Sequence, residues 1–522
     1  MDNFWLNKQG CCVLLFSWLF AMSLALPAEE IPAVSFTVSE FSISGENPIS
    51  LEETNRVLEP FLGEHDGLEG LLEAASEFEA AILNAGFSFN RVLLPPQTLE
   101  AGVVEFKVIQ IQLANVVVEG NEHFTDENIR DSIPGLIVGT TPDTKLLARQ
   151  LIVANKHPSK RITLRMKQSE EADSVDAIVD VKDQRPWQIF SVLNNIGTSK
   201  TGRLRLSAGG QHNNLLGLDD SFTASYTTSP GNTTDVKQWG LNYSIPVYPF
   251  SGKFDFFYSR SDVDSGTVQS VFDVSGAGKF LGGSYTQTFQ NRKNYRHSMK
   301  VGVEDKFFDN NISFSGSQIG KDIRSRPLTL SYFGEMQMEK SQVNFNISYV
   351  RNLHGGKLNT KAAYTASRTD AEQVWDVIRY NATYNRSLGK QWLFKLAMKG
   401  QWSNERLISG EQFGVGGSSS VRGFEERAVS GDRGNQATVQ FSRPLFNKKV
   451  IARLFTDIGH VKVISPTSGQ IGSQTLMSVG AGVSWKINDN FNFSVDYAHE
   501  LNDGRSTDVA GTKTHASLFY RY

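Results

Sequence analysis

The feature that most constrains this chain is an alternation of apolar and polar residues through its last two thirds. Between Trp187 and Tyr522, segments such as 343–349 and 491–497 place an apolar residue at every second position and polar residues between them. A period of two residues puts the apolar side chains on one face of a β-strand. The pattern predicts a long series of strands, in a barrel or a sandwich.

Composition favours strands over membrane helices. Mean hydropathy is −0.29 and 39% of the residues are apolar, whereas each transmembrane helix needs about 20 consecutive apolar residues. Glycine (45 residues) and phenylalanine (34 residues) are abundant, as in proteins built from many short strands. Lys and Arg number 52 against 55 Asp and Glu, which excludes a nucleic-acid binder that relies on overall positive charge.

The first residues are predicted to be a targeting segment. Residues 11–25 form a short apolar run, followed by small residues and Pro27, which indicates a signal peptide over 1–28 with cleavage after Ala25 or Ala28. A single membrane anchor is the alternative, although about 15 residues are too few for a full span. Both cysteines lie inside this run, so the mature exported chain is expected to lack disulfides. If such a chain enters a membrane, it must do so as a closed barrel.

Two small α+β modules are predicted before the alternating region, over 34–110 and 111–185. Each has the order β-α-α-β-β, and their tandem arrangement is an internal repeat. Exposed strand edges in such modules are templates for an extended segment of another chain. The helix expected over 67–85 has an apolar face interpreted as core, made of Leu68, Leu71, Leu72, Ala75, Phe78, Ile82 and Leu83.

The C-terminus gives the barrel an orientation. The final strand places Ala516, Leu518, Tyr520 and Tyr522 on one face, and this aromatic ending resembles the signature of bacterial outer-membrane barrels. Such barrels end in the periplasm, with short turns there and long loops outside. We therefore expect periplasmic turns at 444–448 and 488–490, outer loops at 466–473 and 503–508, and a long outer loop over about 404–435.

One glycine-rich segment of that long loop, residues 411–424, stands out. No Gly-Lys-Ser/Thr follows its glycines, which argues against a nucleotide site. Arg422 offers a fork of donors suited to a carboxylate. Alternation over 452–461 points Asp457 into the barrel, so the two could pair if the loop folds inward. The alternative is a solvated Arg422 and an Asp457 that is one of many lumen acids.

Four segments resemble the two-partner secretion transporters, the outer-membrane components of haemolysin and filamentous-haemagglutinin export within the Omp85 superfamily. Residues 86–108 resemble the end of the family's first POTRA (polypeptide-transport-associated) module. Residues 155–166 with 175–187 resemble the end of the second. VRGF at 421–424 resembles the signature of the sixth extracellular loop, and FTDIG at 455–459 the lumen motif that receives it.

The resemblance implies an all-β transmembrane barrel of about sixteen antiparallel strands over 187–522, preceded by two POTRA modules in the periplasm. Periodicity alone allows about 14 to 18 strands. The implied function is capture of a large unfolded exoprotein, haemolysin-like or adhesin-like, and its secretion through the lumen to the cell surface. Expected partners also include outer-membrane lipid and the barrel-assembly machinery. No metal, cofactor, nucleotide or nucleic acid is expected.

The resemblance also implies two sets of site residues. The first joins the long loop to the lumen wall and consists of Val421, Arg422, Gly423, Phe424, Phe455, Asp457 and Gly459. The second is a strand edge of the first module that would bind the exoprotein, and consists of Phe89, Arg91, Leu93 and Leu94.

Other functions remain open at this stage. An Omp85-type factor that inserts other barrels would share the VRGF loop, although such factors usually carry more modules and the stretch at 91–102 favours the transporter. An enzyme is not indicated, because HExxH and GxSxG motifs are absent from the sequence. A passive porin would not need protein-binding modules. Only five residues separate Ala28 from Val34, too few for the plug helix of related transporters. How the resting pore is closed stays open, and the inserted loop is a candidate.

Overall fold

The computed structural model describes residues 35–98, 101–199, 201–262, 277–309, 321–502 and 511–522, with four two-residue strands at 267–268, 272–273, 313–314 and 317–318. The predicted signal peptide and the predicted outer loop at 503–508 lie outside the described residues. The chain divides into two compact units, which comprise residues 1–85 with 91–109, and residues 86–90 with 110–522.

The first module is a three-stranded sheet covered by two helices. The sheet has the order β2-β5-β4, with β2 parallel to β5, and a separate antiparallel pair joins β1 to β3. β1 and β2 are separated at Ser39, whose backbone N–H donates to the carbonyl of Gly102 at 2.7 Å. Its elements are β1 (Ser35–Val38), β2 (Glu40–Gly45), α1 (Leu51–Leu58), η1 (Glu59–Phe61), β3 (Gly63–Asp66), α2 (Glu69–Asn84), β4 (Asn90–Leu93) and β5 (Val103–Gln110).

The core of this module is narrower than the sequence pattern predicted. Leu71, Phe78 and Ile82 on α2 are buried against Val104 and Phe106 of β5. The expectation that Leu68, Leu72 and Leu83 are also core is wrong, because these side chains are 60%, 59% and 40% exposed. Adjacent helix positions are about 100° apart, so Leu72 cannot share the inward direction of Leu71.

The second module has the element order predicted for it. Its sheet order is β6-β8-β7, built from β6 (Gln112–Glu119), β7 (Lys160–Gln168) and β8 (Ser174–Asp183), with helices α3 (Asp126–Asp131) and α4 (Thr144–Ala154). The Thr125 side chain accepts from the N–H of Asn128 at 3.2 Å, as expected for the residue that caps α3. Asp143 caps α4 in the same way.

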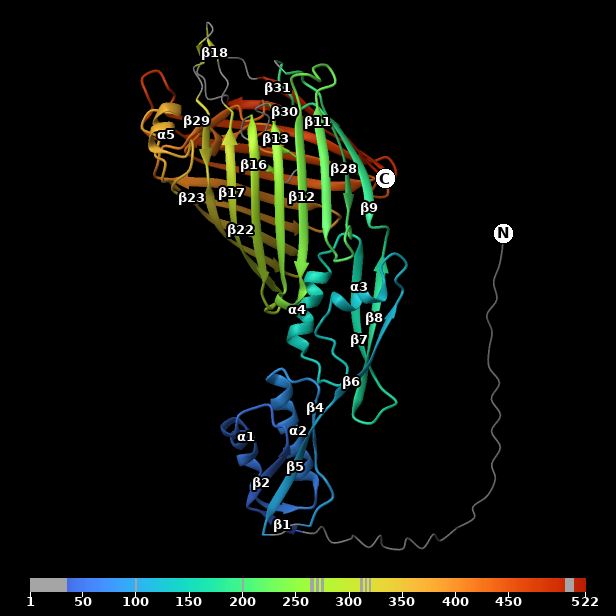
Figure 1. Ribbon diagram of the computed structural model, residues 1–522. Coiled ribbons are helices and arrows are strands. Elements are labelled where there is room, and N and C mark those ends of the chain that lie inside the picture. The colour runs from blue at the N-terminus through green and yellow to red at the C-terminus, as the bar shows by residue number, and fades with distance from the viewer. Residues whose placement is uncertain are drawn as a thin grey trace, which may run out of the picture. The chain divides into compact units, whose positions relative to one another are not determined.

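The rest of the chain is a closed antiparallel barrel (Figure 1). β20 and β21 both pair with β17 and are two parts of one strand, which gives sixteen strands. The last strand pairs with the first and closes the wall. In order they are β9 (Trp187–Asn194), β10 (Arg205–His212), β11 (Ser221–Thr228), β12 (Gln238–Val247), β13 (Gly252–Ser261), β16 (Gly278–Thr288), β17 (Tyr295–Phe308), β20 (Ile323–Ser325), β21 (Pro327–Gln337), β22 (Ser341–Asn352), β23 (Asp376–Ser387), β24 (Leu393–Ser403), β27 (Arg433–Leu445), β28 (Val450–Lys462), β29 (Ser473–Lys486), β30 (Phe491–Asn502) and β31 (Thr512–Arg521).

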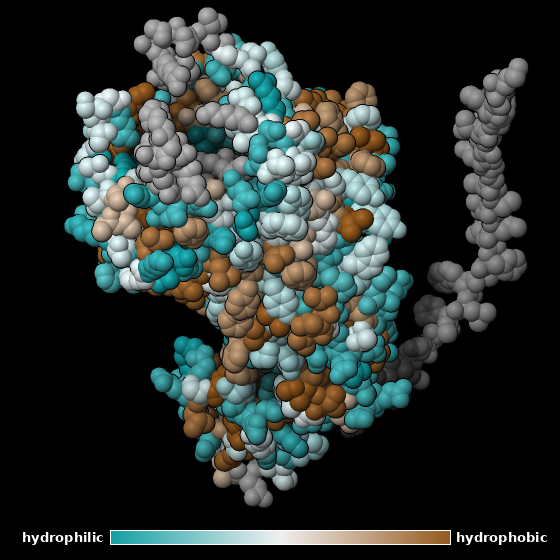
Figure 2. Space-filling view, turned by 45° about the horizontal axis from the view of Figure 1, so that its top comes forward, coloured by the Kyte–Doolittle hydropathy of each residue, from teal (hydrophilic) through white to brown (hydrophobic). Residues whose placement is uncertain are grey.

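The alternation in the sequence separates the outer wall from the lumen. On β28, Leu454 and Ile458 are 57% and 41% exposed on the outside, whereas Phe455 and Asp457 are buried inside. In Figure 2, hydrophobic residues cover parts of the barrel wall and hydrophilic residues gather around its upper end. The predicted fold class, a barrel of about sixteen antiparallel strands after small α+β modules, is confirmed.

Turns and loops alternate at the two ends of the barrel. The end where module 2 enters β9, here the proximal end, has short turns such as 446–449 and 487–490. The distal end has loops 353–375 (loop 5), 404–432 (loop 6) and 463–472 (loop 7). Loop 5 contains α5 (Lys361–Ser367), and loop 6 contains η3 (Ser409–Glu411) and a hairpin of β25 (Phe413–Val415) and β26 (Val429–Gly431). In the described part of the chain, every helix is too short or too polar to cross a membrane.

Candidate functional site

Loop 6 folds from the distal end into the barrel. Its apolar residues pack against Val461 of β28 and Leu476 of β29 in one buried cluster. The loop contributes to this cluster Phe413, Val415, Val421, Phe424 and Val429. Burial of these side chains fixes the loop against one part of the wall, formed by β28 and β29.

Arg422 at the tip of the loop meets Asp457 on β28. The guanidinium donates from Nε to Oδ2 at 2.8 Å and from Nη2 to Oδ1 at 2.9 Å, and the Arg422 backbone N–H adds a third bond to Oδ2 at 3.2 Å. Asp457 is 0% exposed and Arg422 is 7% exposed. This is the two-pronged geometry in which an arginine recognises a carboxylate most strongly.

The residues around this pair complete the contact. The guanidinium carbon lies 3.2 Å from the centre of the Phe455 ring, a cation–π contact. Asp496 of β30 lies 3.4 Å from Nη1 of Arg422 and is itself held by Arg453 at 2.5 Å. Gly423 has φ +103°, which favours glycine, and its N–H donates to Nε2 of His515 at 3.2 Å.

Gly459 provides the space that the loop occupies. A Cβ at this position would lie 2.3 Å from Cγ1 of Val415 and 3.0 Å from Cγ2 of Val421. The structure therefore brings together all seven residues that the resemblance assigned to the loop and the lumen wall.

A second ionic contact holds the other side of the loop. Glu411 is fully buried, and its carboxylate lies 2.9 Å from Nη2 of Arg379 and 3.4 Å from Nζ of Lys306. Ser325 donates to it at 2.8 Å. Burial opposes ionisation of Glu411, but the charges of Lys306 and Arg379 outweigh it and hold the pKa below its usual value.

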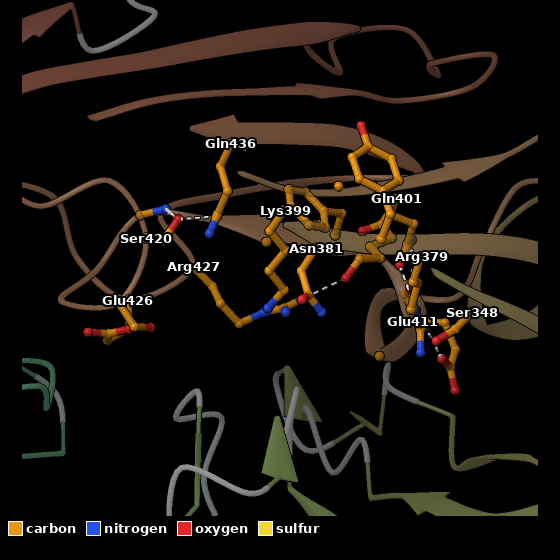
Figure 3. A pocket seen from close by; sticks show the side chains of 18 of the residues that line it. Ser348, Arg379, Asn381, Lys399, Gln401, Glu411, Ser420, Glu426, Arg427 and Gln436 are labelled. Atoms are coloured by element: carbon orange, nitrogen blue, oxygen red, sulfur yellow. Dashed lines mark hydrogen bonds and ion pairs between the residues drawn. The ribbon is translucent and has the colours of Figure 1, made fainter. Parts of the chain in front are cut away.

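These groups line a polar cavity of about 280 Å³ in the lumen (Figure 3). Arg379 and Glu411 lie side by side on one flank of it, and Asn381, Lys399 and Arg427 converge between that flank and the other, which is formed by Ser420, Glu426 and Gln436. The lumen at this level is therefore polar and charged on both the wall and the loop.

A third contact joins three distal loops through Asp432. Its carboxylate accepts from Arg368 of loop 5 at 2.5 and 2.9 Å, from the N–H of Leu407 at 2.9 Å, and from the N–H of Ile464 in loop 7 at 2.7 Å. Burial opposes its charge, yet these hydrogen bonds lower its pKa. A buried apolar cluster around Trp375 and Tyr364 covers the same region.

The strand edge predicted in module 1 is only partly available for pairing with another chain. Arg91 and Leu93 lie on the edge strand β4 and are exposed, whereas Phe89 and Leu94 lie just outside it and are half-buried. The N–H of Val92 donates to Oε2 of Glu79 at 2.9 Å, and Arg91 lies 3.4 Å from the same carboxylate. The Glu79 side chain therefore occupies one of the edge's hydrogen-bonding positions.

A buried polar network joins module 2 to the barrel. Nζ of Lys160 on β7 lies 2.6 Å from Oδ2 of Asp219 in the proximal turn 213–220, and both side chains are essentially unexposed. Ser132 and Tyr248 donate to the same oxygen at 2.8 and 2.5 Å. Asn128 accepts from Lys160 at 2.9 Å.

The charges in this network depend on one another. Burial opposes the charge of Asp219, but Lys160 and the hydrogen bonds from Lys160 and Tyr248 hold the Asp219 pKa below its ordinary value. Burial lowers the pKa of Lys160 against the opposing effect of Asp219. Removal of either partner would leave a buried unpaired charge, which costs about 3–5 kcal/mol.

The sequence motifs led to Arg422 and Asp457 but missed Glu411, Asp432 and the Lys160–Asp219 pair. Glu411 begins the same glycine-rich segment, and its acidic character was the one available signal. Asp432 and Asp219 carry no motif, and their partners lie 64 and 59 residues away. Within the described ranges, no group of three or more His, Cys, Asp or Glu could hold a metal ion.

Comparison with known proteins agrees with this architecture. A sequence model of the family described as haemolysin secretion/activation protein ShlB/FhaC/HecB matches residues 174–485. A model of the ShlB-type POTRA domain matches residues 36–110.

The relatives found are distant but cover most of the chain. Heme/hemopexin transporter protein HuxB of Haemophilus influenzae (strain 86-028NP) is 22% identical over 486 residues, 90% of this chain and 84% of that protein. Outer membrane transporter CdiB of Escherichia coli O6:K15:H31 is 23% identical over 477 residues, 86% of this chain and 76% of that protein. The solved structure of CdiB from Escherichia coli superposes with a TM-score of 0.74 at 17% identity, covering 96% and 93% of the two chains, which shows a shared fold.

We predict that Gly459→Leu displaces loop 6, because even a Cβ would collide with Val415. Overpacking of a tight contact costs about 1–3 kcal/mol. A displaced loop 6 leaves more of the lumen open to ions. Single-channel conductance in planar bilayers should therefore rise about twofold or more relative to the unchanged protein. Gly231→Leu, at a distal position with open space around it, is the control. Equal conductance of the two variants would contradict the close packing.

We predict that acid loosens the contact between module 2 and the barrel. A carboxyl whose folded pKa is depressed adds stability above its unfolded pKa and loses it as the pH falls through the folded value. The folded pKa of Asp219 lies below 3.8, so the stability that its charge adds is lost at pH values below 3.8. Nitroxides at Ala148 and Phe446 should report a broader distance distribution as the pH falls from about 6 to about 3. The Asp219→Asn variant should give a broad distance distribution at both pH values. If its distribution broadened with falling pH as much as that of the unchanged protein, the role of Asp219 would be refuted.

Proposed function

Because the chain belongs to the haemolysin secretion/activation protein ShlB/FhaC/HecB family, we propose that it carries a large partner exoprotein, kept unfolded, from the periplasm to the cell surface through the lumen of its barrel. The protein is a two-partner secretion transporter of the bacterial outer membrane, with its POTRA modules in the periplasm. The distal loops are therefore extracellular and the proximal turns periplasmic. The observation that carries the proposal is a polar lumen crossed by a loop that ion pairs hold in place.

The lumen is suited to an extended polypeptide. A cavity of about 890 Å³ lies inside the wall formed by β9, β10 and β31 and is lined mainly by polar and charged side chains, among them Asn194, Gln211, Asp496 and Arg521. A second, of about 470 Å³, lies between loop 6 and β24. Polar walls offer exchangeable hydrogen bonds to any peptide backbone, so passage would not depend on one sequence.

Loop 6 is proposed as the element that shapes and closes this conduit. Arg422 is held by Asp457 on one wall, and Glu411 is held by Arg379 and Lys306 on another. The signs of the charges are opposite at the two contacts, because the loop supplies a cation at the first and an anion at the second. Such a loop has one favoured position, and breaking a buried pair by removing one member costs about 3–5 kcal/mol.

Capture of the exoprotein is assigned to the edge of module 1 that contains Phe89, Arg91, Leu93 and Leu94. Pairing with an edge strand uses backbone hydrogen bonds, which suit a chain that has not folded. A bound segment would have to displace Glu79 from the Val92 N–H. The exposed Leu93 would then contact the segment's side chains.

The nature of the exoprotein is proposed from the family. Relatives are called heme/hemopexin transporter, hemolysin transporter and outer membrane transporter, and we infer a haemolysin-like or adhesin-like cargo here. During biogenesis the barrel would be inserted by the barrel-assembly machinery, with outer-membrane lipid around it. The alternative of an Omp85-type assembly factor is disfavoured, because the family matched over 174–485 is a secretion family.

We predict that Arg422→Ala lowers secretion of the partner exoprotein by about tenfold or more while the barrel still assembles. The substitution leaves Asp457 buried without its main partner, which costs about 3–5 kcal/mol and frees the loop tip. Secretion is measured as exoprotein in the medium, and assembly as heat-modifiable migration of the barrel in gels.

The control is Arg203→Ala, which removes an exposed arginine from the first distal loop. It should secrete at the unchanged level. Normal export by Arg422→Ala would refute the proposed role of the pair, and loss of the folded barrel would assign Arg422 to assembly instead.

We also predict that a photo-crosslinking residue at Leu93 captures the exoprotein during export. Leu93 is 46% exposed on the proposed edge, and Leu51, which is 72% exposed on α1, is the matched position. Random collision would label the more exposed Leu51 at least as strongly. The proposed capture edge requires a yield at Leu93 at least about threefold higher, and equal yields would remove the argument for it.

A further inference from the structure

The outer wall carries a row of cations close to the extracellular loops. Strand register places Arg260 of β13 directly opposite Lys279 of β16, Lys279 opposite Phe307 of β17, and Phe307 opposite Arg324 of β20. Trp239 of β12 lies opposite Arg260 at the other end. One residue from each of five neighbouring strands therefore lies at the same level of the wall. Three of these residues are cations, Arg260, Lys279 and Arg324, and we call these three the cationic row.

The side chains of this row point away from the lumen. Arg260 lies between the buried Ser259 and Ser261, and Lys279 lies between the buried Gly278 and Phe280. Arg324 likewise follows the fully buried Ile323. Because strand side chains alternate between faces, the three cations lie on the face that meets the membrane.

The row marks the extracellular border of the apolar belt. Two residues further along the strands, toward the middle of the membrane, the outward positions on β12, β13 and β16 are Leu241, Tyr258 and Leu281, whereas β17 has Asp305, the counterion of Arg324, at that position. In the other direction the strands end within two residues of Arg260 and Lys279. The aromatic residues Trp239 and Phe307 at this level match the belts that membrane proteins place at the headgroup layer. The cationic row therefore lies at the depth of the outer-leaflet headgroups.

Among the described residues, the cationic row has more positive charge than its neighbouring carboxylates balance. Arg260 and Lys279 are like charges directly across a strand pair, an arrangement that destabilises a sheet. The counterion of Arg260 is Asp262, at 3.4 Å on the rim. Arg324 shares Asp305 with Arg326, at 3.1 and 2.9 Å. Among the residues that the structure describes, Lys279 has no ion pair.

Another part of the wall has apolar side chains at this level. At the extracellular ends of β30, β9 and β10, the outward positions include Leu501, Leu193 and Leu206, all exposed. Cations recur elsewhere at this level, since Arg433 of β27 lies directly opposite Lys462 of β28. The wall from β13 to β20 places three of them in one register row.

We propose that the cationic row binds the phosphate groups of an anionic glycolipid headgroup in the outer leaflet of the outer membrane. Arginine and lysine are the side chains that recognise phosphate, arginine by paired donors and lysine as a point charge. Neighbouring strands are about 4.8 Å apart, so Lys279 lies about 5 Å from Arg260 and about 10 Å from Arg324 across the wall. One phosphate between Arg260 and Lys279 and a second at Arg324 fit a headgroup that carries two phosphates.

This inference rests on the outer-membrane location of the barrel and leaves the export mechanism untouched. Bound lipid would neutralise the Arg260–Lys279 repulsion and so stabilise the pairing of β13 with β16, next to the third and fourth extracellular loops. The test therefore uses purified full-length protein in detergent, without exoprotein, and secretion is scored separately.

The experiment measures binding of bisphosphorylated lipid A by microscale thermophoresis. The row variant is R260Q/K279Q/R324Q. The matched control, R386Q/R443Q/K448Q, removes three exposed cations from the periplasmic end of the barrel. The proposal requires the unchanged protein and the control to bind alike and the row variant to bind about tenfold or more weakly. Binding by the row variant within twofold of the unchanged protein, or equal losses in both variants, would overturn it.

Two further arms identify the source of the phosphate. Lipid A stripped of its phosphates should bind all three proteins weakly and equally. Inorganic phosphate at millimolar concentration should not displace lipid A, and full displacement would indicate a free-phosphate site and refute the lipid assignment. Heat-modifiable migration reports folding of each variant. If the triple variant does not fold, K279Q alone should still bind lipid A about threefold more weakly, and unchanged binding would overturn the proposal.

Discussion

Every backbone N–H and C=O within a bilayer needs a partner inside the protein, and this requirement governs the rest of the structure. The pairing of β31 with β9 meets it by closing the sheet, since no strand edge then faces lipid. Closure creates an interior that a polar face must line. The barrel therefore has a polar bore, and loop 6 occupies part of it.

Loop 6 is held in the bore through buried carboxylates with different partners. Asp457 on the wall receives the loop's Arg422, Glu411 on the loop receives Arg379 and Lys306 from the wall, and Asp432 receives Arg368 of loop 5. Each contact is charged and hydrogen-bonded, so it specifies position more than it adds stability. At the periplasmic end, the Lys160–Asp219 network joins module 2 to the barrel by the same means.

Much of this architecture was predictable because period-two alternation is a local signal. Strand positions, the inward direction of Asp457 and the tandem modules all follow from spacing. The exposed Leu68, Leu72 and Leu83 show the limit, since hydrophobicity alone does not say how wide a helix face the sheet covers. Glu411, Asp432 and Asp219 could not be assigned from sequence, because their partners come from distant strands and loops. The cationic row likewise becomes visible only when strand register places Arg260 beside Lys279.

The coordination of Asp432 has a consequence for how the extracellular mouth opens. One carboxylate ties Arg368, Leu407 and Ile464, which belong to loops 5, 6 and 7. Withdrawal of any one loop strips hydrogen bonds from a buried anion and so weakens its hold on the other two. The three segments should then leave their places together. Such coupling makes the aperture an all-or-none switch, and a partly lifted mouth would be a scarcely populated state.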